Sequence, residues 1–379
     1  MEVYRTWLYP APNRGVWGRA ANYASFALSA TVVGPWITPR KSVVIATSPQ
    51  LLVGVAGYLV ARARRLPFVF EVRDLWPQSI DAVGATGQRS LLYRTLDGVA
   101  NFLYRRADRI VLDGEWKRRE LVAQGVPAEK TAVIRNGVAE DFALDPESEA
   151  AREVRRKVRK EQSWDGKFVV VYVGTLGMAH GLETVLHAAN RLRECPQVAF
   201  VLIGEGAERD RLTRQAHELN LGNVTFLRKH PRETIPAFLT AADACLVPLR
   251  RKEVFKTAIP SKMFEAMAAA KPVVLGVEGE AREILREAQA GVAFPPEDSH
   301  ALAEAIHVLR NQPELCRNLG KNGRRAVLEK YSRRSQAKAY LRLLGDVAGA
   351  CSGSHSPGPL PVQKSAWTST EEAMTLRKQ

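Results

Sequence analysis

The sequence is poor in cysteine and lacks the spacings that build disulfide or metal scaffolds. Its 379 residues include four cysteines, which stand far apart, form no CxxC pair and have no His-rich neighbourhood: Cys195, Cys245, Cys316 and Cys351. This pattern predicts neither a disulfide framework nor a zinc site and is typical of a reducing cytosol. The residues after Met1 are acidic and aromatic rather than basic and then apolar, so they predict no secretory signal.

Long apolar runs are also missing. A membrane-spanning helix needs roughly 20 consecutive apolar residues. The two stretches that come closest, residues 23–38 and 43–61, are interrupted by Pro35 and by the Ser-Pro-Gln of residues 48–50. We therefore expect buried helices there, or a face that lies on a membrane surface, rather than a transmembrane segment.

Acidic residues are outnumbered. The chain has 55 Lys and Arg against 40 Asp and Glu, which gives a formal net charge of +15. Such a chain favours anionic partners, namely phosphates, nucleic acid or acidic lipid. The sequence contains no zinc finger, helix-turn-helix or basic repeat with interleaved aromatic residues, so it predicts no nucleic-acid partner.

Basic residues gather on the expected helices of the first half, close in sequence to aromatic ones. The basic set is Arg62, Arg64, Arg65, Arg89, Arg94, Arg105, Arg106, Lys117, Arg118 and Arg119, and the aromatic set is Trp7, Trp17, Tyr23, Phe26 and Trp36. They predict an anionic membrane surface as a partner. A soluble basic surface is the alternative, which the sequence leaves open. We expect a cytoplasmic protein, peripheral on the inner face of the plasma membrane in the first case.

Short apolar runs alternate with helical stretches along the chain, which is the pattern of a parallel sheet with crossover helices. In the first half we expect strands at 43–47, 67–72, 108–112 and 131–134, with helices at 51–64 and 115–124. The repeat then restarts with strands at 168–173, 198–203, 224–227, 244–248 and 272–275, and helices at 182–193, 207–219, 235–242 and 262–269. The fold class is therefore α/β, with two similar halves.

A highly charged stretch separates the two halves. Residues 149–162 predict a helix rich in arginine and lysine, and it precedes Trp164 and Gly166. We divide the chain into a first domain at 1–147, a linker helix at 148–165, a second domain at 166–330, a C-terminal helix at 331–346 and a tail at 347–379. The tail is rich in turn formers, which predicts disorder.

Two glycine turns follow strands of the second half. Strand 168–173 leads into Gly174, Thr175 and Gly177 before a helix, so backbone N–H groups are expected to hold a phosphate there. The spacing is not that of the dinucleotide motif, and a tight turn needed only for packing is the alternative. Glu205 lies in a second turn, residues 203–206, at the same edge of the sheet.

A third segment begins a helix with Ile259, Pro260, Ser261 and Lys262. Proline and serine are frequent at helix starts. Glu265 lies one turn further on, where its carboxylate is expected to accept hydrogen bonds from ribose hydroxyls while Lys262 and free N–H groups hold a diphosphate. A solvent-facing glutamate is the alternative.

These segments resemble glycosyltransferase family 4. The matching motifs are Gly174 to Gly177, Ile203 to Gly206, Pro260 to Val273 and Gly279 to Glu283 in the second half, and Val72 to Pro77, Tyr104 to Asp108 and Ile134 to Val138 in the first. The first-half motifs look like the branch that acts in surface-polysaccharide synthesis, including fucosamine transferase-like enzymes. The resemblance extends from Val3 to about Leu344.

The resemblance implies a GT-B fold, in which two Rossmann-like domains face a cleft. It implies a nucleotide-sugar donor, with a lean to UDP, on the second domain and a lipid-linked or glycan acceptor on the first. The reaction would be glycosyl transfer with retention at the anomeric carbon and without a metal or other cofactor, and the sequence shows no evident DxD pair. The leaving diphosphate needs donors that absorb its negative charge.

The sequence departs from the family pattern at three places. Thr257 stands where the first glutamate of the family's E-x7-E pair is expected. Met178 and His180 replace the family's diphosphate clamp, which leaves Lys262, Lys256 or Arg228 as candidates. Arg73 and Asp74 stand at a His-Asp pattern. The expected catalytic residues are Arg73, Asp74 and Lys262, and the expected donor-binding residues are Gly174, Thr175, Gly177, Glu205, Leu227, Arg228, Ile259, Pro260, Ser261 and Glu265.

Family members carry further strands and a glycine-rich loop before a segment that resembles the residues after Val3. We therefore expect a first domain without its first strands, because of a late start codon or a truncated chain. The alternative to an enzyme is a non-catalytic homologue that only binds nucleotide sugar.

Overall fold

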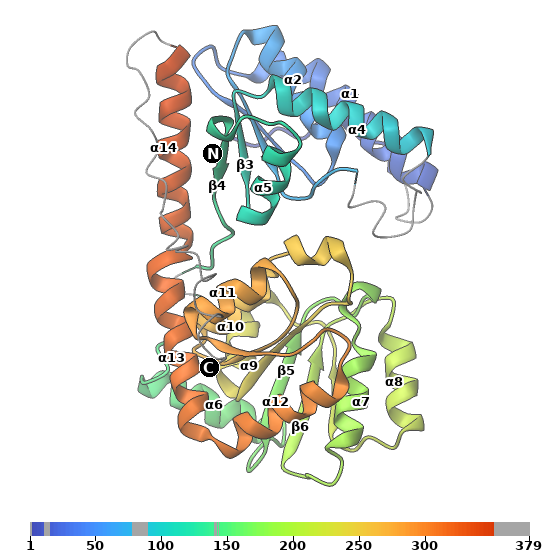
Figure 1. The fold of residues 1–379 in the computed structure, drawn as a ribbon, viewed down its shortest axis with the longest axis vertical. Coiled ribbons are helices and arrows are strands. Elements are labelled where there is room, and N and C mark those ends of the chain that lie inside the picture. The colour runs from blue at the N-terminus through green and yellow to red at the C-terminus, as the bar shows by residue number, and fades with distance from the viewer. Residues whose placement is uncertain (1, 11–15, 78–89, 140–141, 143, 352–379) are drawn as a thin grey trace, which may run out of the picture.

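The computed structural model describes residues 2–10, 16–77, 90–139, 142 and 144–351. Two α/β domains, each built around a parallel sheet, follow one another along the long axis of the molecule (Figure 1). The expectation of two α/β halves is confirmed. Within the part of the chain that is described, no helix is both long enough and apolar enough to span a bilayer.

The first domain has four strands in the order β1-β2-β3-β4 among its described residues. They are β1 Val44–Thr47, β2 Phe68–Val72, β3 Arg109–Leu112 and β4 Thr131–Val133, and the helices are α1 Val16–Ile37, α2 Leu51–Arg64, α4 Leu91–Arg106 and α5 Glu115–Ala123. Aliphatic and aromatic side chains of β2, α2 and α4 form the core on one face of the sheet. The α4 helix has no counterpart among the expected helices.

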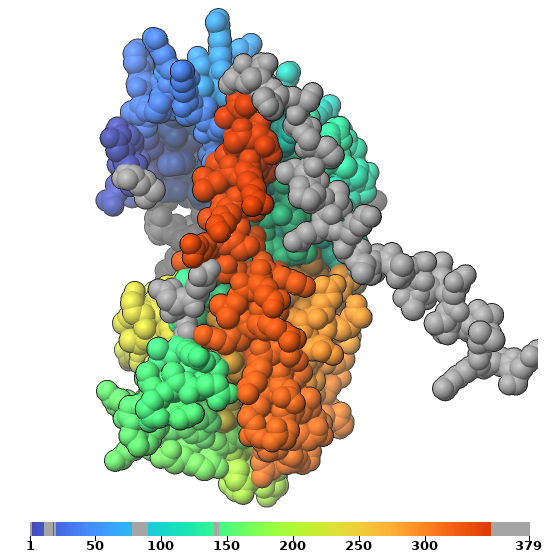
Figure 2. Space-filling view, turned by 90° about the vertical axis from the view of Figure 1, so that its left-hand side faces the viewer, coloured from blue at the N-terminus to red at the C-terminus, as the bar shows by residue number. Residues whose placement is uncertain are grey.

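The opposite face of the first sheet is covered by the end of the chain. Helix α14, Arg333–Cys351, runs back along the first domain (Figures 1 and 2). Its Leu343 and Val347 pack against Val69 of β2 and Val111 of β3. The helix continues five residues beyond the expected end at 346, and residues 352–379 lie outside the described part of the chain.

The second domain has the strand order β10-β9-β8-β5-β6-β7. The strands are β5 Phe168–Val173, β6 Val198–Ile203, β7 Val224–Leu227, β8 Ala244–Pro248, β9 Val273–Gly276 and β10 Gly291–Ala293, and the helices are α6 Glu149–Glu161, α7 Glu183–Arg191, α8 Arg209–Glu218, α9 Ile235–Ala241, α10 Ser261–Ala268, α11 Glu280–Ala288, α12 Ser299–Asn311 and α13 Pro313–Lys330. The order reverses between β5 and β8, and ligands of such sheets bind at the carboxyl ends of the strands beside this switch point.

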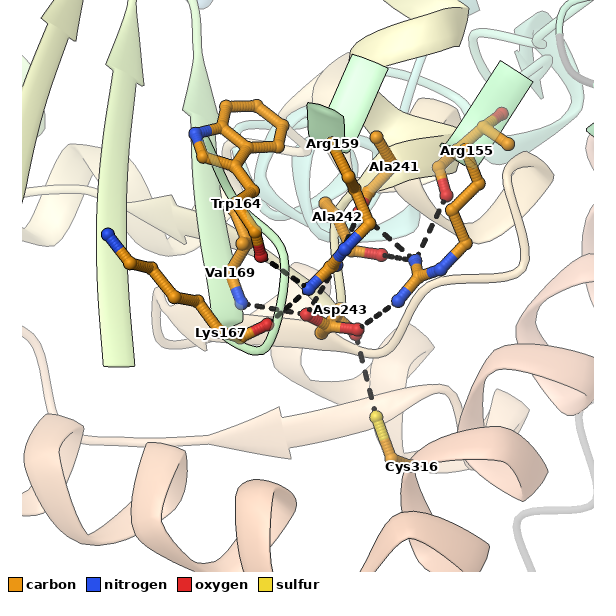
Figure 3. A network of polar contacts seen from close by, with 10 residues as sticks. Arg155, Arg159, Trp164, Lys167, Val169, Ala241, Ala242, Asp243 and Cys316 are labelled. Atoms are coloured by element: carbon orange, nitrogen blue, oxygen red, sulfur yellow. Dashed lines mark hydrogen bonds and ion pairs between the residues drawn. The ribbon is translucent and has the colours of Figure 1, made fainter. Parts of the chain in front are cut away.

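Helix α6 is bound to the second domain by a network of arginines around one carboxylate (Figure 3). Arg155 donates to Asp243 Oδ1 at 2.6 Å, and Arg159 donates to Asp243 Oδ2 at 3.1 Å. Arg159 is buried and also donates to the carbonyl oxygens of Ala241 and Trp164. The segment expected as a linker therefore packs on the second domain.

The arginine network generates a stability prediction. Asp243→Ala leaves the Arg159 guanidinium buried without its carboxylate, and breaking a buried pair in this way costs about 3–5 kcal/mol. We expect the free energy of unfolding, measured by urea titration, to fall by that amount. Glu194→Ala removes an exposed pair with Arg193 and should leave the free energy unchanged within error. Equal effects of the two substitutions would contradict the structural role of Asp243.

Candidate active site

A pocket with a volume of about 280 Å³ lies where the two domains meet. The first domain contributes Arg73 and the segment that follows β4, the second contributes α10 and the loop before α9, and α14 contributes its first residue. The lining residues are Arg73, Asn136, Gly137, Val138, Arg232, Ile259, Ser261, Phe264, Glu265 and Arg333. Polar groups from five separate segments therefore converge on one hollow.

Arg73 is held in place at three points. It follows β2, and its backbone N–H donates to Ser48 Oγ at 2.9 Å. Its carbonyl oxygen accepts a hydrogen bond from the Lys117 ammonium. Its guanidinium donates to Asn136 Oδ1 at 2.6 Å. The side chain is thereby fixed at the pocket before any ligand arrives.

Glu265 presents its carboxylate to the pocket from the second turn of α10. Arg232 donates to its Oε1 at 3.3 Å, and the Arg232 side chain is exposed. Burial raises the pKa of Glu265, while Arg232, Lys262 and Arg333 act in the opposite direction. A long, exposed ion pair of this kind contributes little to stability, so the carboxylate can exchange Arg232 for the hydroxyls of a ligand at small cost.

Lys262 lies on the same helix but does not line the pocket. Its ammonium donates to the Tyr172 hydroxyl at 3.1 Å and stands 4.2 Å from the centre of that ring. It reaches the underside of the first glycine turn, where a Cβ added to Gly174 would lie 2.7 Å from the Lys262 Nζ atom. Burial lowers the pKa of Lys262 to about 8, and Glu265 opposes this shift.

His180 closes the same glycine turn. Burial and the nearby Lys262 charge lower its pKa to about 4, so the imidazole is neutral at pH 7. The family clamp lysine is expected near this position, and a neutral histidine supplies no cation. Lys262 brings a positive charge to this turn at Gly174.

The second glycine turn packs against the first. An ideal Cβ on Gly204 would lie 1.9 Å from the Gly174 carbonyl oxygen. The N–H of Leu176 donates to the Glu205 carbonyl oxygen at 2.9 Å. Glycine at position 204 is therefore required by the contact between the loops, whatever their ligand.

The predicted residues separate into two groups. Arg73, Ile259, Ser261 and Glu265 line the pocket. The others do not line it: Asp74 follows Arg73 and is exposed, Pro260 precedes α10, and Gly174, Thr175, Gly177, Glu205, Leu227 and Arg228 lie at the carboxyl ends of β5, β6 and β7. Lys256, the further clamp candidate, pairs with Glu253.

Several pocket residues were missed at the level of sequence. Asn136 lies in a segment recognised only as a family motif. Arg232 precedes α9 and carries no local signal. Arg333 was assigned only to a C-terminal helix, and its place in the pocket depends on the return of α14 to the first domain.

Comparisons with known proteins agree with this architecture. Residues 154–326 match the family model described as "Glycosyl transferases group 1", and residues 1–137 match the model described as "Glycosyl transferase 4-like domain". The chain belongs to the GT-B glycosyltransferases. The expected fold is thus confirmed, as is the broad family.

Curated relatives of this glycosyltransferase include "Probable glycosyltransferase WbjE" of Pseudomonas aeruginosa, 30% identical over 70% of this chain and 66% of that protein. The "GDP-mannose-dependent alpha-(1-6)-phosphatidylinositol monomannoside mannosyltransferase" of Mycolicibacterium smegmatis is 26% identical over 63% of this chain and 62% of that protein. The chain therefore spans slightly less than two thirds of the length of these two relatives.

Solved structures share the fold at lower identity. A crystal structure of Anabaena Alr3699/HepE in complex with UDP has a TM-score of 0.70 at 20% identity and covers 88% of this chain and 84% of its own. A crystal structure of WaaG, "a glycosyltransferase involved in lipopolysaccharide biosynthesis", has a TM-score of 0.66 at 17% identity and covers 89% and 85%.

The predicted role of Lys262 in diphosphate binding makes donor affinity depend on pH. The pKa of about 8 means that the ammonium loses its proton as the pH rises through that value. We expect the dissociation constant of UDP, measured by calorimetry, to rise about tenfold between pH 7 and pH 9, since only the charged form binds well. Lys262→Arg stays charged and should show little pH dependence. The same dependence in both proteins would exclude Lys262 as its source.

The lowered pKa of Lys262 also makes the free energy of unfolding depend on pH. Between pH 8 and 10.5 the unfolded chain holds a proton that the folded chain has lost. Stability therefore rises with pH across this window. A fall in UDP affinity above pH 8 would therefore not be caused by destabilisation of the fold through Lys262.

Proposed function

We propose that this glycosyltransferase moves a sugar from a nucleoside diphosphate donor to a lipid-linked or glycan acceptor in cell-surface glycan synthesis, with retention at the anomeric carbon. The observation that carries the proposal is the pocket, in which Glu265 of the second domain faces Arg73 of the first. A carboxylate suited to a ribose diol and a fixed guanidinium suited to a phosphate meet there from opposite domains.

Each group has a part in this proposal. Glu265 accepts hydrogen bonds from the ribose, and the N–H groups of the Gly174 turn hold the diphosphate with Lys262 beneath them. The bond between the anomeric carbon and the diphosphate oxygen breaks, and the acceptor hydroxyl oxygen bonds to the same face of that carbon. The hydroxyl proton leaves with the diphosphate. Lys262 and Arg73 stabilise the negative charge that develops on this leaving group.

UDP is the proposed nucleotide. Similar structures are described as complexes with UDP and with UDP-glucose. One relative is named as dependent on GDP-mannose, so GDP is the nucleotide to compare. The sugar is left open, because the described pocket lining holds arginines, a glutamate and an asparagine that suit many hydroxylated rings.

Glu265→Ala tests the donor site. Loss of a hydrogen-bonded, charged partner of the ribose costs about 1.5–3 kcal/mol, which corresponds to a roughly 10- to 150-fold weaker affinity for UDP in calorimetry. Glu233→Ala, an exposed glutamate beside Arg232, is the matched control and should bind UDP like the parent protein. Unchanged affinity of the Glu265 variant would refute the donor site.

Turnover decides between an enzyme and a homologue that only binds nucleotide sugar. UDP release from a panel of UDP-sugars with polyprenyl-diphosphate-linked acceptors, with the product's anomeric configuration read by NMR, tests both transfer and retention. Tight donor binding without transfer to any of these acceptors would favour the non-catalytic alternative.

The first domain presents a surface that suits an anionic membrane. Residues 3–70 contain no Asp or Glu, whereas eight of them are Lys or Arg. Leu28, Val32 and Trp36 follow one another at helical spacing on α1 and are 68%, 61% and 88% exposed. Apolar side chains within a basic region are the composition of a membrane-surface helix. We therefore propose that the protein binds peripherally to the inner face of the plasma membrane.

Some residues expected on that surface lie elsewhere. Lys117 is buried, and Arg118 donates to Thr131 and Glu115. Arg64 donates to the Thr38 carbonyl oxygen. Arg89 lies outside the described residues. The proposed membrane surface therefore consists of helix α1 and the end of helix α2.

Leu28→Ser and Trp36→Ser test this surface by sedimentation with vesicles. We expect the parent protein to bind phosphatidylglycerol vesicles more strongly than phosphatidylcholine vesicles and to be released by salt. Each substitution should weaken binding at least about fivefold, as loss of buried apolar area requires. Leu341→Ser, at an exposed leucine of α14, is the control. Equal binding to neutral vesicles, or no effect of Leu28→Ser and Trp36→Ser, would contradict the proposal.

A further inference from the structure

A carboxylate of the second domain caps a helix of the first. Glu280, the first residue of α11, is 2% exposed. Its Oε1 accepts from the Glu115 N–H at 2.8 Å and its Oε2 from the Trp116 N–H at 2.9 Å. These two residues begin α5, whose N-cap residue Gly114 has no side chain that could accept a hydrogen bond from them. The free N–H groups of that helix end thus find their acceptor in the other domain.

Two further contacts strengthen this junction. Arg135, which follows β4, donates to Glu280 Oε1 at 3.0 Å. The indole N–H of Trp116 donates to Glu283 Oε2 at 3.0 Å. The approach is close, because a Cβ on Gly114 would lie 2.6 Å from Glu280 Oε2. Both carboxylates come from the first turn of α11.

The segments that Glu280 contacts are the ones that hold Arg73. Helix α5 carries Lys117, which donates to the Arg73 carbonyl oxygen and pairs with Asp113 at 2.7 Å. Arg135 precedes Asn136, which accepts from the Arg73 guanidinium. One carboxylate of the second domain therefore contacts the two segments that carry Lys117 and Asn136, two of the three supports of Arg73.

We propose that Glu280 is a positioning residue that couples closure of the two domains to the placement of Arg73 at the pocket. When the domains separate, Glu280 loses three donors and the α5 end loses its acceptors, so the hydrogen bonds favour the closed arrangement. Trp116 and Glu283 form a second, independent contact of the same junction. The effect on turnover rests on the proposed function, whereas the effect on closure does not.

Glu280→Gln tests the inference, with Glu287→Gln, at an exposed glutamate of the same helix, as the matched control. We expect amide hydrogen exchange in the peptide that spans the start of α5 to become at least tenfold faster, and the radius of gyration of the full chain in X-ray scattering to increase. With donor and acceptor present, kcat should fall at least tenfold while the dissociation constant of UDP stays within twofold.

Results for Glu280→Gln that match those of Glu287→Gln in exchange and radius of gyration would overturn the inference. A tenfold loss of UDP affinity at unchanged kcat would overturn it too, since Glu280 would then act on the donor site. If Glu280→Gln does not fold by circular dichroism, Arg135→Gln decides. It removes the ion pair with Glu280 Oε1, and faster exchange at α5 supports the inference whereas unchanged exchange contradicts it.

The two proposals fail separately. If the parent protein turns over no nucleotide sugar, the proposed function is refuted. Amide exchange at α5 and the radius of gyration still test whether Glu280 holds the junction closed. If the parent protein turns over donor and Glu280→Gln leaves turnover, amide exchange and radius of gyration unchanged, only the inference about Glu280 is refuted.

Discussion

The two chain segments that connect the domains are hydrogen-bonded to each other, and this pairing positions the pocket residues and helix α14. The chain leaves the first domain after β4 and returns before α14, and the crossings bind each other. Val138 donates to the Tyr331 carbonyl oxygen at 3.0 Å, and Arg333 donates to the Val138 carbonyl oxygen at 2.9 Å. Asn136 and Arg333 are thereby brought beside α10, and α14 is directed onto the bare face of the first sheet. The same pairing of segments therefore serves both the pocket and the packing of α14.

Local patterns account for what the sequence predicts well. Strands 168–173 and 198–203 appear with the expected bounds because unbroken apolar runs next to glycine turns have few other solutions in a doubly covered sheet. The start of α10 is marked by Pro260, so Ser261 and Glu265 could be assigned to one helix face in advance. Both residues line the pocket.

Long-range packing accounts for the rest. Arg333 is separated from Glu265 by much of the second domain in sequence, and only the return of α14 brings them together. The direction of Lys262 is set by Tyr172, a buried residue of β5 whose ring and hydroxyl attract the ammonium under Gly174. Glu280 appears within a family motif, yet its acceptor role depends on how the two domains meet.

Electrostatics connects the pocket with the junction. The described pocket lining has three guanidinium groups, those of Arg73, Arg232 and Arg333, and one carboxylate, that of Glu265. Closing the domains without an anionic ligand brings these like charges together, which opposes closure. Glu280 neutralises Arg135 at the same junction, so Arg135 adds no unpaired positive charge there. In the proposed reaction, the negative charge that develops on the leaving diphosphate would offset part of the repulsion, so closure would matter most at the transfer step, in which Arg73 takes part.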